Sequence, residues 1–307
     1  MNEPRRYRDD RDLEAMLQVL MEGRKADNGS YYVHIGDLKW WLYYPPLESD
    51  LWNHIYLWDD PDQEGRLLGW ALISPDWVGF DVYIQPELRG SDYARDMYVW
   101  AEAQAIEIAR KKELKTIYCL WVRHDDRVLA EHLTSRGFHL RRGMIHLTRT
   151  WAEDLPPVEL PDGFSLRSSN GLPDVKARSM VQYGAFNSSA PFERYLERFA
   201  NFMRSPVYQS ELDIVAVASD GRIGAFCIVW IDPVNQVGLY EPVGTHPDFQ
   251  RKGLGRAVMM EGLRRLQERG AKSAIVSTYE DNLAGIKLYE AAGFQQVHRL
   301  GTYEKDY

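Results

Sequence analysis

Residues 243–266, VGTHPDFQRKGLGRAVMMEGLRRL, join an apolar run to a helix-patterned segment through a turn that contains Gly253 and Gly255. In the helical segment apolar residues recur at spacings of three and four, with charged residues between them. The two glycines remove side chains, so the backbone of the turn can approach a ligand closely. The first amides of the following helix lack internal acceptors and lie at the positive end of its dipole. This turn therefore predicts a binding site for a pyrophosphate.

The spacing of the glycines separates three known phosphate-binding loops. A Walker loop needs GxxxxGK followed by Ser or Thr, which neither glycine offers, and a dinucleotide fingerprint needs a third glycine where this chain has Val258. The remaining pattern is Gln-x-x-Gly-x-Gly, beginning at Gln250. Three basic side chains lie in or beside it: Arg251, Lys252 and Arg256. An ordinary glycine-rich turn that caps a helix is the alternative interpretation.

Two further segments accompany this loop. LYEPVGTHPD, residues 239–248, leads into it, and NLAGIKLYEAAGF, residues 282–294, follows it. In this order and at this separation, the three segments resemble the GNAT superfamily of N-acetyltransferases, and the resemblance covers roughly residues 160–307. It implies a mixed α/β sheet whose fourth and fifth strands splay apart to admit a thioester. It also implies acetyl-CoA as cosubstrate and no metal.

The resemblance further implies which residues hold acetyl-CoA. The incoming strand would pair with the pantetheine arm as a neighbouring strand does, and backbone amides near Val243 would stabilise the tetrahedral oxyanion. Asn282 either caps the later helix or bonds the pantetheine, and the two roles are compatible. The implied cofactor-binding residues are Val243, Thr245, Gln250, Arg251, Lys252, Gly253, Leu254, Gly255, Arg256, Ala257 and Asn282.

Glu241 is the candidate general base. An alkylamine, with a pKa of roughly 10.4, is protonated at neutral pH and must lose a proton before it attacks a thioester. Strict alternation along the strand predicts that Glu241 shares a face with Val243 and Thr245. In many members of the superfamily the carboxylate base lies in this strand, in some of them two residues earlier, where this chain has Leu239. The alternative is a structural glutamate at a strand edge, held by an arginine or by water.

Tyr289 is the candidate general acid. A thiolate leaving group with a pKa of roughly 8.5 needs only modest help, and a phenol near 10 can hydrogen-bond to it or protonate it. The alternative is an amphipathic tyrosine that closes its helix against the sheet.

The first half of the chain reads as a degenerate copy of the second. VYIQPELRGSDYARDMYVW parallels the region of the glycine loop, and RVLAEHLTSRGF parallels NLAGIKLYEAAGF. In place of QRKGLG the first half has RGSDY, with only Gly90 retained and with Asp92 adding negative charge; Leu133 replaces Tyr289. A repeat of this length indicates two similar domains. We therefore predict one working cofactor site, in the second half, with the first half serving as scaffold, pocket wall or dimer surface.

A chain of 307 residues suits two such domains. We expect a degenerate GNAT-like domain at 1–152, a proline-rich linker at 153–163 and a catalytic domain at 164–307, each domain a mixed, mostly antiparallel sheet with a splayed central strand pair flanked by helices. The hydrophobic pattern of the second half predicts strands at 164–167, 212–219, 223–231, 237–245, 273–277 and 297–303 and helices near 173–183, 191–203, 253–268 and 282–291. Cys119 and Cys227 lie in apolar runs and indicate neither a disulfide nor a metal site.

The composition excludes several classes of function. A net charge of −8 argues against a nucleic-acid binder. The sequence shows neither a signal peptide nor a membrane span, so we expect a cytoplasmic monomer or homodimer. Aromatic residues are dense at 31–58, where they would either pack in a core or line an acceptor pocket.

The resemblance implies an acetyl-CoA-dependent N-acetyltransferase that acts directly, in a ternary complex, on the amine of a small molecule. The duplicated layout is similar to that of the mycothiol synthases, which makes an amino thiol one acceptor to consider. A non-catalytic acyl-CoA binder or sensor is the main alternative, and a protein or peptide N-acetyltransferase is a third.

Overall fold

The protein is described here from a computed structural model, which covers residues 3–27, 29, 32–47, 49–151 and 155–307. The chain forms two compact units that interleave along the sequence. Unit 1 comprises residues 1–33, 48–146 and 298–307, and unit 2 comprises residues 34–47 and 147–297. The linker expected at 153–163, of which residues 153 and 154 lie outside the described part, does not by itself divide the two units. Residues 34–47 of the first half belong to unit 2, and residues 298–307 of the second half belong to unit 1.

Unit 1 is built on a sheet with the strand order β1-β2-β3-β4-β5-β12. All described pairs are antiparallel except β4 and β5, which pair in parallel only at Gly79↔Tyr118 and Phe80↔Cys119. Its elements are β1 (Arg5–Arg6), α1 (Asp10–Ala26), η1 (Leu51–His54), β2 (Ile55–Asp59), β3 (Leu67–Ser74), β4 (Gly79–Ile84), η2 (Pro86–Leu88), α3 (Asp92–Lys111), β5 (Thr116–Arg123), α4 (Arg127–Ser135), part of β6 (His139–Thr150) and most of β12 (Gln295–Asp306).

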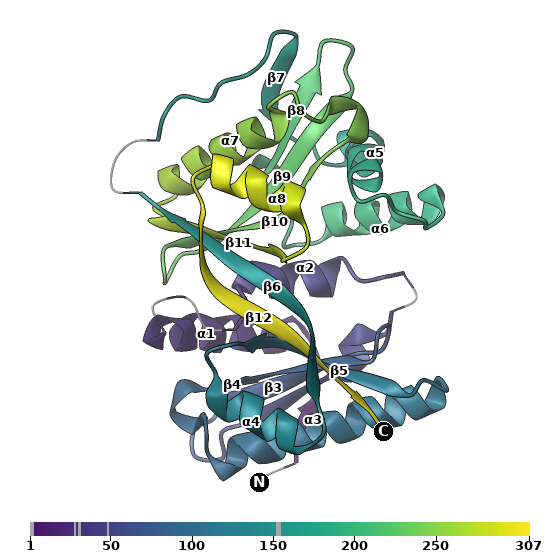
Figure 1. The fold of residues 1–307 in the computed structure, drawn as a ribbon, viewed down its shortest axis with the longest axis vertical. Helices are drawn as coiled ribbons and strands as arrows, with labels where there is room; N and C mark the ends of the chain where they lie inside the picture. The colour runs from purple at the N-terminus through teal and green to yellow at the C-terminus, as the bar shows by residue number, and fades with distance from the viewer. Residues whose placement is uncertain (1–2, 28, 30–31, 48, 152–154) are drawn as a thin grey trace. The chain divides into compact units, whose positions relative to one another are not determined.

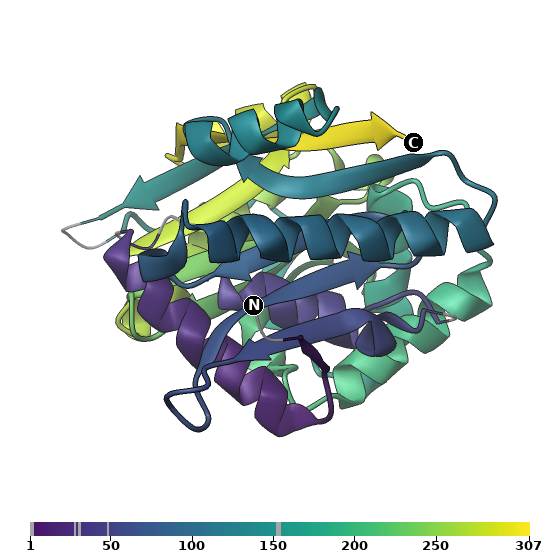
Figure 2. The same ribbon diagram turned by 90° about the horizontal axis from the view of Figure 1, so that it is seen from below.

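Helices α1 and α3 cover opposite faces of this sheet (Figure 2). On one face the Tyr83 hydroxyl donates to the carbonyl of Val19 in α1 at 2.9 Å. On the other, a Cβ at Gly69 would lie 2.7 Å from Met97 in α3. The buried core between the sheet and α3 is rich in alanine and aromatic side chains, which allows the helix to approach closely.

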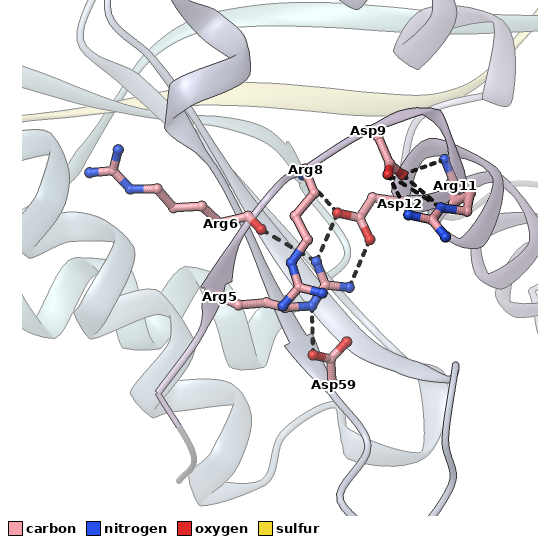
Figure 3. Close-up of polar contacts among 7 residues, drawn as sticks. All are labelled: Arg5, Arg6, Arg8, Asp9, Arg11, Asp12 and Asp59. Atoms are coloured by element: carbon pink, nitrogen blue, oxygen red, sulfur yellow. Dashed lines mark hydrogen bonds and ion pairs between the residues drawn. The ribbon is translucent and has the colours of Figure 1, made fainter.

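The start of the chain is fixed to unit 1 by charged side chains. Arg5 donates to both carboxylate oxygens of Asp12 at 2.8 Å and to Asp59 at 2.7 Å (Figure 3). The amide of Arg8 donates to the same Asp12 carboxylate at 2.8 Å. Bidentate pairing of this kind is directional, so it sets how α1 leaves β1.

Unit 2 is built on a sheet with the strand order β6-β11-β10-β9-β8-β7. Each strand and helix predicted for the second half is present, with boundaries within three residues. Its elements are α2 (Ile35–Tyr43), β7 (Phe164–Ser168), η3 (Leu172–Asp174), α5 (Val175–Ala185), α6 (Phe192–Arg204), η4 (Ser210–Leu212), β8 (Asp213–Ala218), β9 (Ile223–Asp232), β10 (Val237–Thr245), η5 (Pro247–Phe249), α7 (Leu254–Glu268), β11 (Ser273–Tyr279) and α8 (Leu283–Ala291).

The splayed strand pair predicted from the sequence is confirmed. Strands β10 and β11 pair in parallel at Val237↔Ser273, Gly238↔Ala274 and Leu239↔Ile275, and no pairing between them continues beyond Leu239. All other described pairs in unit 2 are antiparallel. The same divergence of β4 and β5 in unit 1 confirms the duplicated α/β architecture.

The faces of the unit 2 sheet carry different helices (Figure 1). On one face lies α7, where Tyr240 donates to the carbonyl of Met259 at 2.6 Å. On the other face Leu239 packs with Trp40 of α2 and Phe202 of α6. The alternation of Leu239 and Tyr240 between these two layers follows from the period of a strand.

Each half of the chain contributes an edge strand to the unit that is formed mainly by the other half. Residues of β12 from the second half pair with β5 in unit 1, from Leu300↔Arg123 to Asp306↔Thr116. The end of β6, from the first half, lies beside β11 in unit 2, where the Thr148 hydroxyl donates to the carbonyl of Ala274 at 3.2 Å. Both crossing strands follow a glycine with positive φ, Gly137 and Gly293.

The aromatic segment at 31–58 packs mainly in the two cores; residues 31 and 48 lie outside the described part. Trp40 and Tyr44 belong to the core of unit 2, whereas Tyr56 and Trp58 belong to that of unit 1. This favours core packing, the first of the two interpretations that the sequence left open. In the described ranges, every helix is too short or too polar to traverse a lipid bilayer.

Candidate active site

The glycine turn ends in an uncapped helix. Gly253 is the N-cap of α7 and has φ 82°, and no side chain caps the helix. The first intrahelical bond runs from the amide of Ala257 to the carbonyl of Gly253 at 3.0 Å, which leaves the amides of Gly255 and Arg256 without an acceptor inside the helix. A Cβ at Gly255 would lie 3.0 Å from the Thr245 hydroxyl, so this glycine lets the helix approach β10. The turn therefore presents free amides at a positive helix end, which suits a diphosphate.

The side chains of the turn contribute in different ways. Lys252 lies 5.1 Å from the ring of Phe249, and Gln250 donates weakly to the carbonyl of Thr245 at 3.4 Å. Arg251 adopts a positive φ of 61°. Arg256 donates to the carbonyl of Ala291 at 3.2 Å and lies 3.4 Å from Glu159. Leu254 and Ala257 are buried, so these two residues offer a ligand only their backbone.

The corresponding helix of unit 1 has its end occupied. Ser91 caps α3 and its hydroxyl accepts from the amide of Ala94 at 3.2 Å. Asp92, the first residue of α3, forms an ion pair with Arg95. A side-chain oxygen and a carboxylate therefore take the place that a phosphate would need.

We expect Ser91→Ala to lower the free energy of unfolding by about 1 kcal/mol, because it removes a helix cap. It should leave the affinity for coenzyme A unchanged, since this helix end is closed to phosphate. Thermal unfolding and calorimetric titration with coenzyme A measure the two quantities. A variant that loses coenzyme A affinity without losing stability would contradict the assignment of the site to unit 2.

A bulge interrupts β10 beside the turn. Tyr240 pairs with Val229 and Val243 pairs with Cys227, so Glu241 and Pro242 both oppose Ile228. The extra residue reverses the faces of the strand beyond it. Glu241 lies on the face of Leu239 and α2, whereas the Thr245 side chain faces α7. The expectation that Glu241 shares a face with Val243 and Thr245 was therefore wrong, because strict alternation does not hold across a bulge.

The Glu241 carboxylate is half-buried, and no hydrogen bond or ion pair to it is found among the described residues. Its backbone carbonyl is held by Trp230, whose indole donates to it at 2.7 Å. Burial, together with the negative charge of Asp37, raises the pKa of Glu241 to about 8. A carboxylate that is poised near neutral pH and is free of a structural partner is suited to exchange protons.

Tyr289 in α8 is buried and lies close enough to Glu241 for their charges to interact. Burial and that carboxylate raise the pKa of its hydroxyl, so Tyr289 remains protonated at neutral pH and can donate a hydrogen bond. Glu241 and Tyr289 come from β10 and α8, on either side of α7 in the sequence. The fold thus places the two candidate residues within electrostatic range of each other.

Asn282 is the N-cap of α8. Its side-chain oxygen accepts from the amide of Gly285 at 3.1 Å, and its side-chain nitrogen donates to the Thr278 hydroxyl at 2.9 Å. A Cβ at Gly285 would lie 2.5 Å from the Asn282 side chain, so the cap is tightly enclosed. The capping role predicted from the sequence is confirmed.

Residues 180–294, which contain this whole constellation, match the model of the family described as "Acetyltransferase (GNAT) family". These residues therefore form a domain of the GNAT type of acetyltransferase.

Curated relatives and solved structures extend the match beyond the GNAT domain. A mycothiol acetyltransferase of Streptomyces coelicolor is 27% identical over 92% of this chain and 87% of its own length. One of Saccharomonospora viridis is 28% identical over 57% of this chain, and the match spans 60% of that relative. A tandem GNAT protein from the clavulanic acid biosynthesis pathway has the same fold, with a TM-score of 0.68, 18% identity, and coverage of 99% of this chain and 97% of that one.

One element of the GNAT site was missed from the sequence. Helix α2 of the first half belongs to unit 2, and its Asp37 interacts with Glu241. The pattern His34-x-x-Asp37 does form a capping box, which predicts a helix start, but no local signal indicates against which sheet that helix packs. As for metals, the described residues include no group of histidine, cysteine or acidic side chains able to hold an ion.

Proposed function

We propose that this chain transfers the acetyl group of acetyl-CoA to the amine of a small molecule, within a ternary complex of protein, acetyl-CoA and amine. The observation that carries the proposal is that Glu241, a carboxylate of β10 without a hydrogen-bond or ion-pair partner among the described residues, lies within electrostatic range of the buried Tyr289 in a domain that also presents the uncapped start of α7. A phosphate-binding turn alone would serve any nucleotide, and a non-catalytic binder would need neither side chain.

The residues of the turn bind and orient acetyl-CoA. The free amides of Gly255 and Arg256 take the diphosphate, with Lys252 and Arg251 adding positive charge. The part of β10 that has separated from β11, from residue 240 onwards, has a strand edge available to the pantetheine arm. In this proposal, backbone amides near Val243 stabilise the oxyanion of the tetrahedral intermediate. Asn282 contributes indirectly, because as the N-cap it fixes the start of α8.

Glu241 accepts the proton that the amine must lose. With a pKa of about 8, Glu241 is a much stronger base than an ordinary carboxylate. Its pKa is therefore closer to that of an ammonium group, which is roughly 10.4, and proton transfer between the two costs less free energy. The amine nitrogen attacks the thioester carbon, its proton passes to Glu241, and the carbon–sulfur bond breaks as the carbonyl reforms. Tyr289 hydrogen-bonds to the departing sulfur and gives it its proton, and the proton taken up by Glu241 returns Tyr289 to its neutral form; the products are an amide and coenzyme A.

Tyr289→Phe should lower kcat by about 10- to 100-fold, because the sulfur loses its hydrogen-bond donor in a partly desolvated place. The acetyl-CoA dissociation constant should change little, since the aromatic ring and its contact with Phe294 are kept. Steady-state kinetics and equilibrium binding separate the two effects. An unchanged kcat would contradict the role of Tyr289 as general acid and would leave it as a residue that only packs α8 against the sheet.

The acceptor is argued from the relatives. Several of them are named mycothiol acetyltransferases, which supports an amino thiol as the first acceptor to test. The chain carries Leu239 where some members of the superfamily carry the base, and it has its carboxylate at Glu241, two residues further along the strand. Such a shift moves the proton acceptor relative to the bound amine, so a wider panel of small amines belongs in the same test.

The decisive test incubates the full-length protein with acetyl-CoA and a panel of amines, including amino thiols and amino sugars, and follows both free thiol and acetylated product. For amino thiols the product is read by mass spectrometry, because the acceptor itself carries a thiol. Amine-dependent turnover is expected. Tight acetyl-CoA binding without turnover on any amine would favour the sensor, and turnover only on peptides would favour protein acetylation.

A further inference from the structure

Helix α2 is anchored to the strand that carries Glu241. The imidazole of His34, the N-cap of α2, lies 3.1 Å from the carbonyl of Val237 in β10. Gly36 packs on the indole of Trp230, where an added Cβ would lie 2.5 Å from Cγ. The same indole donates to the carbonyl of Glu241 at 2.7 Å. The start of α2 and the backbone of Glu241 are therefore joined through one side chain.

The far end of α2 is fixed as well. Tyr44, its C-cap residue, has the guanidinium of Arg198 over its ring at 3.7 Å, and Arg198 also donates to the Tyr44 carbonyl at 3.1 Å. Gln182 of α5 donates to the Tyr44 hydroxyl at 3.4 Å. A helix held at both ends keeps the side chains of its first turn in fixed places.

Asp37 lies in that first turn. One carboxylate oxygen accepts from the amide of His34 at 2.7 Å and so completes the capping box. From there the charge of Asp37 acts on Glu241, which has no salt-bridge partner among the described residues. The ionisable groups that interact with Glu241 are thus Asp37 from α2 and Tyr289 from α8. Burial and the charge of Asp37 both disfavour the negative charge of Glu241.

We propose that Asp37 is a positioning residue for the acetyl transfer: from a helix of the first half of the chain, it sets how readily Glu241 holds and releases a proton. The inference rests on the proposed function, in which Glu241 is the base. It gives the first half a part in catalysis without a second cofactor site.

The direction of the effect follows from like charges. An ionised Asp37 makes the ionised form of Glu241 less favourable, and this adds to the effect of burial in raising the pKa of Glu241. Without the charge of Asp37, Glu241 loses its proton at lower pH and becomes a weaker base. The limb of the rate profile on the acid side should then move to lower pH, while the plateau rate falls.

The test compares Asp37→Asn, Asp37→Glu and a control, Glu197→Gln, in full-length protein. Asparagine keeps an acceptor for the His34 amide and removes the charge, and Asp37→Glu keeps the charge. Glu197 is an exposed residue of α6, so its variant changes the net charge of unit 2 equally. Carboxyl ¹³C NMR of protein labelled in its glutamate side chains, with the Glu241 signal assigned by its loss in Glu241→Gln, follows titration directly.

In Asp37→Asn the ionised fraction of Glu241 at pH 7 is expected to rise about threefold or more, and the rate at pH 7 should rise relative to the plateau by the same factor. Asp37→Glu should restore the native titration, and Glu197→Gln should leave it unchanged. Identical titration of Glu241 in Asp37→Asn and native protein would overturn the proposal. A shifted titration in a protein that acetylates no amine would instead leave the coupling intact and remove the proposed function.

Discussion

Glu241→Gln is expected to lower kcat/KM for acetyl transfer by about 100- to 10,000-fold, the range for loss of a general base. Glutamine has nearly the same shape and keeps a hydrogen-bonding side chain, but it cannot take a proton. The half-buried carboxylate of Glu241 makes no hydrogen bond or ion pair among the described residues, so the substitution removes no structural contact of that kind. The loss should therefore fall on proton transfer and not on the binding of acetyl-CoA.

The pH profile gives this prediction its sharpest form. Because the pKa of Glu241 is raised to about 8, the native kcat/KM should rise with pH up to about 8 and then level off as the base becomes fully ionised. Deprotonation of the amine itself adds a second rise near its own pKa. In Glu241→Gln the first limb should vanish and the second should remain. A native-like limb in the variant would show that another group is the base.

Stability provides the control for Glu241→Gln. The pKa of Glu241 in the folded protein lies above the ordinary value of 4.5, so the folded state holds this proton more tightly than the unfolded chain. The native protein therefore loses stability as pH rises from about 4.5 to about 8, and the loss is complete above that range. We expect the glutamine variant to have a higher Tm than native protein at pH 9 and a similar Tm at pH 4. A lower Tm at pH 9 would mean that the activity was lost through damage to the fold.

Gly253→Asp is expected to weaken the binding of acetyl-CoA by about 100-fold, or about 2.7 kcal/mol. Gly253 has φ 82°, and a Cβ added there would meet nothing within 4 Å; aspartate is among the residues that tolerate this left-handed conformation. The added carboxylate would lie at the N-terminus of α7, where it competes with the diphosphate for the free amides and repels it. Isothermal titration with coenzyme A measures the loss.

Gly253→Asn is the matched control. It has the same size and the same tolerance of positive φ but no charge, so it should retain most of the affinity that aspartate removes. Equal affinity of native protein and Gly253→Asp would place the diphosphate elsewhere and remove the basis of the proposed function. The first half already shows the acidic arrangement, with Ser91 and Asp92 at the start of α3.

Local chemistry explains why much of unit 2 could be predicted from the sequence. The predicted strand at 237–245 is β10 to the residue, and the helix predicted at 253–268 begins at Leu254 with Gly253 as its cap. These elements are specified by short-range features: apolar period, a glycine that permits positive φ, and an asparagine that caps the next helix. Glu241 and Tyr289 were identified as candidates through the resemblance to the GNAT superfamily, and the structure places them within electrostatic range of each other.

The sequence by itself predicted the strands, the helices and the glycine turn of the second half, because each depends on residues that are neighbours in the chain. The parallel between the two halves predicted the duplicated α/β architecture, and the resemblance to the GNAT superfamily supplied the candidates for base and acid. Only the tertiary structure decided which face Glu241 occupies, since Pro242 is compatible with either a strand edge or a bulge and the pairing opposite Ile228 is what shows the shift in register. It also decided that α2 belongs to unit 2 and that β12 completes the sheet of unit 1. Two similar sheets present similar apolar faces, and the choice between them is made by packing over the whole length of the chain rather than by periodicity within one segment.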